Sequence, residues 1–177
     1  EPDVKRRLFL KYGLAGGAML VLGGVGLSLR TGPLAPLPQS GLKVLTHRQW
    51  STLVALAGVV IGGRAKLPSA DDLNVAGMVD QLFATLHPDL SSELALVLNL
   101  LENPVAGALL DARPAPFSGL PLAERVEAVR AWRNSRLAPR RAGIRALIAL
   151  INSSYWSRRE TWAHVGYPGP PRLGGAK

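Results

Sequence analysis

The sequence predicts an all-α protein, with an N-terminal transmembrane or signal helix followed by a small irregular bundle of about five helices. Three observations support this fold class. Apolar residues recur at helical spacing from residue 43 onward, and no stretch shows the two-residue alternation of a strand. An uncharged run, Tyr12–Leu29, precedes them. The 177 residues leave room for one domain of modest size beside that run.

Residues 1–29 form the leader. A helix over Tyr12–Leu29 would be about 27 Å long, close to the roughly 30 Å hydrocarbon core of a bilayer. Basic residues flank only its N-terminal end, which predicts a cytoplasmic N-terminus and a periplasmic main domain. Prolines surround Ala35, so no small-x-small cleavage site is visible. We therefore expect the leader to be retained as an inner-membrane anchor.

Residues 30–42 contain three prolines and two glycines and are expected to form an extended, semi-rigid tether between the membrane and the domain. The helical domain is expected over residues 43–166, and a Pro/Gly-rich tail over residues 167–177.

The first two helices have recognisable start signals. Thr46 followed by Gln49 is a capping box, and Gly62-Gly63 ends the helix that begins there. The second helix follows Pro68, with Ser69 as its cap and Asp72 in its first turn. The third, over residues 90–103, is apolar nearly all round and is expected to be the central buried helix.

The second half contains a loop and two more helices. Residues 103–121 hold four prolines, which predicts a loop with at most a short turn around Val105–Leu110. The fourth helix, over residues 122–135, should turn Val126, Val129 and Trp132 inward. The fifth spans about residues 139–158, with Arg141 and Arg145 on its outer side and a core stripe of Ile144, Leu147, Ile148, Ile151 and Tyr155.

The positive charge is concentrated in the last third, where residues 124–177 carry eleven Lys/Arg against three acids, a net +8. Such a basic stretch could bind nucleic acid, an anionic membrane surface or an acidic protein. No zinc spacing, RNA-binding signature or phosphate loop accompanies it, which disfavours nucleic acid, and a solvated arginine-rich helix face is the favoured interpretation. The chain has no cysteine, which excludes disulfides and covalent c-type haem.

No motif indicates catalysis by this chain. Its three histidines, at 47, 87 and 164, lie near expected helix ends, where capping or surface roles fit better than metal ligation. No nucleophile turn and no dinucleotide-binding glycine motif is present. The sequence therefore predicts no catalytic, cofactor or metal site.

One cluster near the C-terminus, SSYWSRRETWAHVGYPGPPR, indicates a partner-binding surface. Aromatic residues and arginine are enriched at interfaces, and a proline run is pre-ordered for docking. The alternative is that Trp156 and Trp162 complete the domain's own core. The candidate partner-binding residues are Tyr155, Trp156, Arg158, Arg159, Trp162, Tyr167, Pro168 and Pro170.

The start of the chain, KRRLFLK, resembles a twin-arginine (Tat) signal, which would engage the Tat translocase and export an already folded protein. The alternative is an ordinary single-span anchor with chance arginines. The residues that carry the resemblance are Arg6, Arg7, Phe9, Leu10 and Lys11.

The chain also resembles the small (gamma, or third) subunit of gluconate 2-dehydrogenase-type complexes. The resemblance is carried by LTHRQWSTLVALAGVVI, LPSADDLNVAGMVDQLF, AERVEAVRAWRNS and YWSRRETWAHVGYPGP. Family members often have proline after the first helix, where Gly62-Gly63 stand here.

This resemblance implies a non-catalytic subunit that exports, anchors and stabilises a flavin-dependent dehydrogenase of the glucose–methanol–choline class. FAD would be bound by that partner and haem c by a possible cytochrome c partner, with no cofactor on this chain. Two alternatives stay open. One is a structural subunit of a larger membrane electron-transfer complex, where the leader's glycines would allow close helix approach. The other is an enzyme in its own right.

Overall fold

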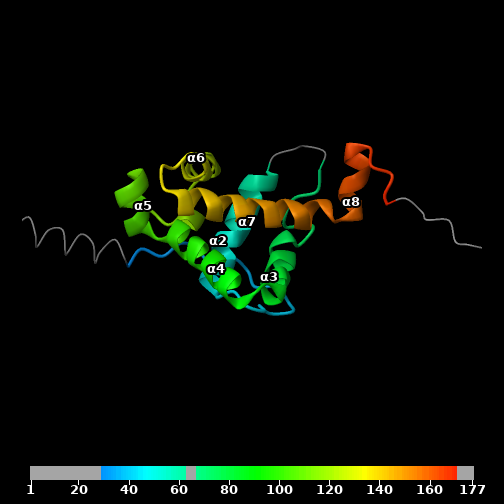
Figure 1. Ribbon diagram of the computed structural model, residues 1–177, viewed down its shortest axis with the longest axis horizontal. Helices are drawn as coiled ribbons and strands as arrows, with labels where there is room; N and C mark the ends of the chain where they lie inside the picture. The colour runs from blue at the N-terminus through cyan, green and yellow to red at the C-terminus, as the bar shows by residue number, and fades with distance from the viewer. Residues whose placement is uncertain (1–28, 63–66, 171–177) are drawn as a thin grey trace, which may run out of the picture.

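The computed structural model describes residues 29–62 and 67–170, and all regular elements in these ranges are helices (Figure 1). The all-α prediction is confirmed. Seven α-helices occur in the described chain where the sequence suggested about five, because α5 and α8 are additional. The elements are α2 (His47–Ile61), α3 (Val75–Thr85), α4 (Pro88–Glu102), α5 (Pro104–Asp111), α6 (Leu122–Arg133), α7 (Ala138–Trp156) and α8 (Arg159–Trp162), with 3₁₀ turns η1 (Phe117–Gly119) and η2 (Ala163–Val165).

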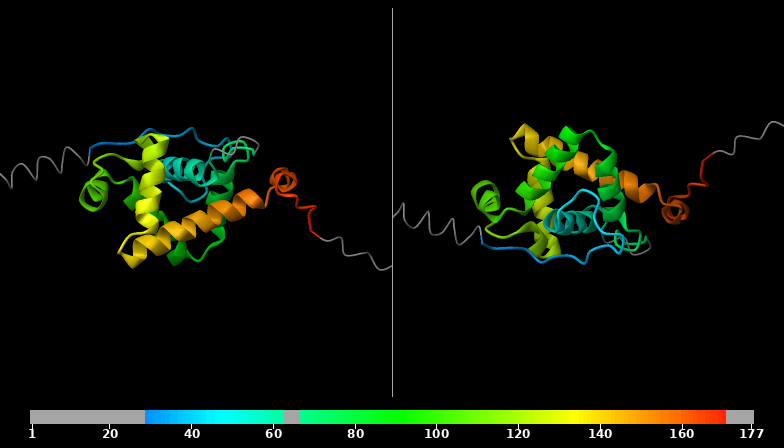
Figure 2. Two further views of the ribbon diagram at one scale, coloured as in Figure 1. Left: turned by 90° about the horizontal axis from the view of Figure 1, so that it is seen from above. Right: turned by 90° about the horizontal axis from the view of Figure 1, so that it is seen from below.

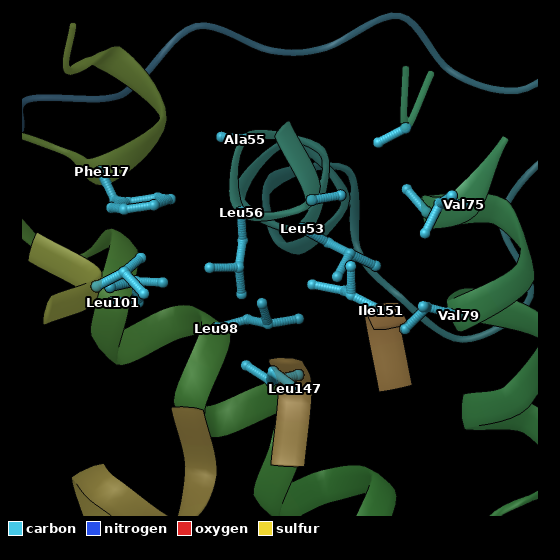
Figure 3. Close-up of a cluster of buried hydrophobic side chains, with 14 of the residues drawn as sticks. Leu53, Ala55, Leu56, Val75, Val79, Leu98, Leu101, Phe117, Leu147 and Ile151 are labelled. Carbon is cyan, nitrogen blue, oxygen red and sulfur yellow. The ribbon is translucent and has the colours of Figure 1, made fainter. Parts of the chain in front are cut away.

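Helix α2 is the centre of the bundle, since it packs against α3, α4, α6, α7 and η1. Figure 3 shows α2 with Leu53 and Leu56 surrounded by buried side chains of the other elements. The expectation that α4 is central is wrong. It buries Leu94, Leu98 and Leu101 but leaves Leu96 65% exposed, because an apolar face without a neighbouring helix stays at the surface.

The predicted start of α2 is confirmed. Thr46 Oγ1 accepts from the backbone N–H of Gln49 at 3.4 Å, and the Gln49 side chain accepts from the Thr46 N–H at 2.9 Å. This reciprocal pair satisfies two backbone donors that a helix start leaves without partners. The helix ends at Ile61 with Gly62 as its cap, and Gly63 lies outside the described residues.

The predicted cap of the second helix forms, but it closes a separate turn. The Ser69 N–H donates to Asp72 Oδ2 at 2.9 Å, and the Asp72 N–H donates to Ser69 Oγ at 3.0 Å. These bonds to Ser69 lower the pKa of Asp72. Asn74 then takes a left-handed conformation, φ 49°, so continuous α3 begins only at Val75.

Residues 29–45 form a strap that is extended, as the prolines predict, and runs along the body (Figure 2). It is bound to α2 as well. The Ala35 N–H donates to Ser51 Oγ at 2.8 Å, and the Trp50 indole N–H donates to the Pro36 carbonyl at 2.9 Å. The strap is therefore part of the folded domain rather than a spacer that stands free of it.

Asp80 on α3 fastens the end of the strap. Its carboxylate is buried, with the residue 2% exposed, and accepts from the backbone N–H groups of Lys43, Val44 and Leu45 at 2.6, 3.2 and 3.0 Å. A carboxylate that accepts three N–H bonds satisfies backbone donors that would otherwise have no partner.

The segment expected to be a loop contains α5. The Asn103 side chain accepts from Val105 and Ala106 N–H at 2.8 and 3.1 Å, and Pro104 occupies the first helical position. A proline at that position starts a helix rather than preventing one, which is why the loop prediction is wrong here. Helix α5 leaves Leu109 80% exposed.

Within the described residues no single helix has the length and hydrophobicity to cross a membrane, although α4 and α5, bent by 74°, meet both criteria jointly.

Helices α6 and α7 pack against each other and against α2. In α6, Val129 and Trp132 are buried as predicted, but Val126 is 36% exposed, which corrects that assignment. In α7 the predicted stripe is buried except for the half-buried Ile148. The predicted transmembrane helix lies outside the described residues, apart from its last residue, Leu29.

Candidate partner-binding site

The C-terminal module, defined as residues 159–170, consists of α8, η2 and the segment that follows. It stands beyond the end of α7, clear of the main bundle (Figure 1 and Figure 2). The corner between α7 and α8 is closed by Thr161, which is fully buried and donates from Oγ1 to the Arg158 carbonyl at 2.7 Å. The module therefore has a fixed attachment and a largely solvent-facing surface.

Trp162 is the centre of this module. Its indole N–H donates to the Trp156 carbonyl at 2.9 Å, and the Tyr167 ring meets it edge-on at 5.3 Å. The chain then folds back over the indole at Gly169, where φ is +102° and an added Cβ would lie 3.2 Å from the ring. The positive φ favours glycine, and a side chain at this position would press against the ring. The aromatic cluster thus organises the module locally and does not fill the main core.

The structure separates the predicted partner-binding residues into two groups. Tyr155 is 1% exposed, and its hydroxyl donates to the Pro68 carbonyl at 2.8 Å, so it belongs to the core. Trp156 is half-buried against the same core and meets Tyr155 edge-on at 5.0 Å. For these two residues the core alternative describes the structure better than an open interface.

The other predicted residues are accessible to different degrees. Arg158 is half-buried and contacts Glu160 at 3.5 Å, whereas Arg159 is exposed, with its guanidinium 5.9 Å from the Trp162 ring centre. Trp162 is half-buried. Tyr167, Pro168 and Pro170 are exposed.

Val165 was missed by the sequence reasoning. It is 55% exposed on η2, beside the aromatic residues of the module. The signal that could have found it is the sequence Trp-Ala-His-Val-Gly-Tyr, in which an apolar residue stands between two aromatics outside any long helix.

The export-signal residues Arg6, Arg7, Phe9, Leu10 and Lys11 lie outside the described residues.

The histidines that the structure describes lie apart, and their positions agree with capping or surface roles. His47 Nε2 lies 2.8 Å from the Ala35 carbonyl oxygen, His87 accepts from Asp89 N–H at 3.4 Å as the cap of α4, and His164 is exposed. Among residues 29–62 and 67–170, no group of three His, Cys, Asp or Glu side chains could hold a metal ion.

A buried ionic cluster joins α5 to α7, and no sequence pattern predicts it. Arg140 donates to Asp111 at 2.6 Å and stacks over the Trp132 ring, with its guanidinium carbon 4.4 Å from the ring centre. Arg113 contacts the same carboxylate at 3.8 Å, and burial lowers its pKa. The three charged side chains are 7–12% exposed, and their ion pairs link the end of α5 to the start of α7.

Comparison of the chain with models of known protein families, with curated proteins and with solved structures finds no match.

Proposed function

We propose that this chain is the non-catalytic small subunit of a membrane-associated, periplasmic, flavin-dependent dehydrogenase of the glucose–methanol–choline class. It would carry the Tat export signal, anchor the complex to the inner membrane and stabilise the catalytic subunit. FAD would belong to the catalytic subunit, and haem c to a cytochrome subunit where one is present.

The observation that carries the binding part of this proposal is the C-terminal module. Val165 and Tyr167 are 55% and 46% exposed, and the module is built locally around Trp162 outside the main core. A short segment that orders itself around an indole and presents aromatic and arginine side chains has the composition of a protein-binding hot spot. Its pre-formed shape reduces the conformational entropy lost when a partner binds.

The positions of the two chain ends support the anchoring part. The N-terminal and C-terminal ends of the described chain lie at opposite ends of the body (Figure 1). At the N-terminal end, Arg30 donates to the Pro114 carbonyl at 3.0 Å, which brings the strap beside the segment after α5. An anchor entering at that end would leave the C-terminal module directed away from it, open to a second protein.

A co-purification experiment tests the binding part. The chain is co-expressed with the flavin-dependent dehydrogenase expected to be encoded beside it, and the flavin absorbance that co-elutes is measured. Replacing Val165 and Tyr167 with serine should reduce co-elution at least tenfold. The melting temperature should change little, because Val165 and Tyr167 are 55% and 46% exposed and the ring contact of Tyr167 with Trp162 lies inside the module, outside the main core.

Val44→Ser is the matched control, because Val44 is 45% exposed and belongs to the strap, not to the module. Unchanged co-elution with the Val165 and Tyr167 variant would show that the module is not the binding surface.

A further inference from the structure

A second surface feature is an arginine-lined groove between the C-terminal half of α2 and the facing sides of α6 and α7. Its volume is about 740 Å³. Of its apolar residues, Val129 is buried and Val59, Val60 and Ile148 are half-buried, and we call these the floor. Arg130, Arg133 and Arg145 are exposed at its rim and come from two different helices. The described lining residues, none of them acidic, are Val59, Val60, Val126, Val129, Arg130, Arg133, Asn134, Arg145, Ile148 and Asn152.

Two of these arginines have no carboxylate partner among the described residues. Arg130 pairs with Glu127 at 2.8 Å, whereas Arg133 and Arg145 form no ion pair within the parts of the chain that the structure describes. Arg130 and Arg133 complement the C-terminal end of the α6 dipole. That explanation does not cover Arg145, which lies in the middle of α7 and faces the same groove.

The groove leads toward the C-terminal module. Arg145, Ile148, Asn152 and Trp156 follow one another at intervals of three and four residues, so they lie along one face of α7. The first three line the groove, and Trp156 ends the row at the C-terminal end of α7, three residues before the C-terminal module begins. A partner seated in the groove could therefore reach the module without leaving this face.

We propose that the groove binds an acidic amphipathic helix of the partner protein, with the apolar stripe of that helix on the valine floor and its carboxylates at Arg133 and Arg145. This inference rests on the proposed function, in that it names the class of partner segment. A floor recessed between helices accepts one face of a helix about 10 Å wide. Basic residues that flank an apolar floor match carboxylates that flank an apolar stripe.

Other occupants fit the groove less well. A bilayer surface would contact the exposed arginines but not the buried Val129, and a nucleic acid backbone gains nothing from a floor of valines and isoleucine. A second copy of this chain would bring together two molecules of net charge +9.

The probe is a synthetic amphipathic peptide of about 18 residues, with leucines along one helix face and glutamates flanking them. Its binding to the full-length chain is measured by fluorescence anisotropy. A second peptide carries lysine in place of each glutamate. Arg133→Glu should weaken binding of the acidic peptide roughly five- to tenfold. Arg136→Glu is the matched control, because Arg136 is an exposed arginine just beyond α6 and outside the groove.

The charge swap makes the test specific. The double variant Arg133→Glu with Arg145→Glu should prefer the lysine peptide over the acidic one. Melting temperatures within a few degrees of the parent would show that each variant is folded. Added salt should weaken the wild-type interaction.

Several results would overturn the inference. The acidic peptide binding equally well to parent and Arg133→Glu, or losing as much affinity with Arg136→Glu, would indicate general attraction to a basic protein. Binding of anionic vesicles or single-stranded DNA that depends on Arg133 and Arg145 would assign the groove to a membrane or to nucleic acid. Self-association abolished by Arg133→Glu would assign it to a second copy. Because co-purification of the dehydrogenase is tested through Val165 and Tyr167, each proposal can fail without the other.

Discussion

Removing the Asp80 carboxylate should release the strap from α3. Asp80→Ala deletes the acceptor of three backbone N–H groups, and each bond to a charged acceptor contributes about 1.5–3 kcal/mol. Lys43 and Val44 are exposed, so water can replace the carboxylate at two of these donors, whereas Leu45 is 4% exposed. We therefore expect a loss of about 2–4 kcal/mol in the free energy of unfolding.

The Asn variant refines this prediction. Asp80→Asn can keep its oxygen on the Val44 and Leu45 donors but turns its amide NH₂ toward the N–H of Lys43. Its expected loss is about 1–2 kcal/mol, smaller than that of Asp80→Ala.

The assay combines urea unfolding with amide hydrogen exchange. Asp71→Ala is the control, because it removes an exposed carboxylate from the turn before α3. Amide exchange at residues 43–45 should be faster in Asp80→Ala than in this control. A loss below about 1 kcal/mol for Asp80→Ala, or strap exchange equal to that of the control, would refute the reasoning.

Two further predictions concern the core and acid stability. Leu98→Ala should lower the free energy of unfolding, measured with urea, by about 2–5 kcal/mol, because Leu98 is fully buried. Leu96 is 65% exposed on the same helix, so Leu96→Ala should change that free energy by less than about 0.5 kcal/mol. Equal losses for the two variants would contradict the assignment of Leu98 to the buried face of α4. Because the pKa of Asp72 is lowered below 3.8 in the folded chain, the Ser69–Asp72 pair stabilises the fold above that value, and its contribution is lost as the pH falls through the folded pKa. Ser69→Ala should therefore reduce the fall in unfolding free energy on acidification, and an unchanged pH dependence would argue against the pair.

The parts of the fold that could be read from the sequence are those set by local chemistry. The Thr46–Gln49 capping box, the helical period of α7 and the glycine stop of α2 each depend on neighbouring residues, and the structure has all three. The sequence predicts a loop over residues 104–111 because the prolines of this segment, Pro104 among them, count as helix breakers. In the structure Pro104 starts the helix, and Gly107 lies close to the Arg113 carbonyl, where a side chain would not fit.

The sequence does not show which face of each helix packs against which other helix. The residues of α4 are apolar nearly all round, and only the positions of α2 and α7 decide that Leu98 is buried and Leu96 is not. Val126 has the spacing of a core residue, yet it is 36% exposed and lines the arginine-lined groove. The groove itself depends on Val59 and Arg145, which are 86 positions apart in the chain.

The candidate partner-binding site shows the same division. The aromatic and arginine composition indicated a binding segment, and the structure places Arg159 and Tyr167 on an accessible module. The sequence could not separate these from Tyr155, whose hydroxyl bonds to Pro68 across the fold. Helical spacing shows which residues share a face of a helix. Whether that face is buried depends on the position of the neighbouring segments.

The central claim, that this chain carries a bound dehydrogenase across the membrane, is tested most directly by locating the enzyme's activity after cell fractionation. Arg6→Lys together with Arg7→Lys keeps the charge that orients the leader while altering the twin-arginine pair, and Lys5→Arg serves as the control. The account predicts that dehydrogenase activity moves to the cytoplasmic fraction in the double variant and stays periplasmic in the control. Full periplasmic activity in the double variant would contradict it.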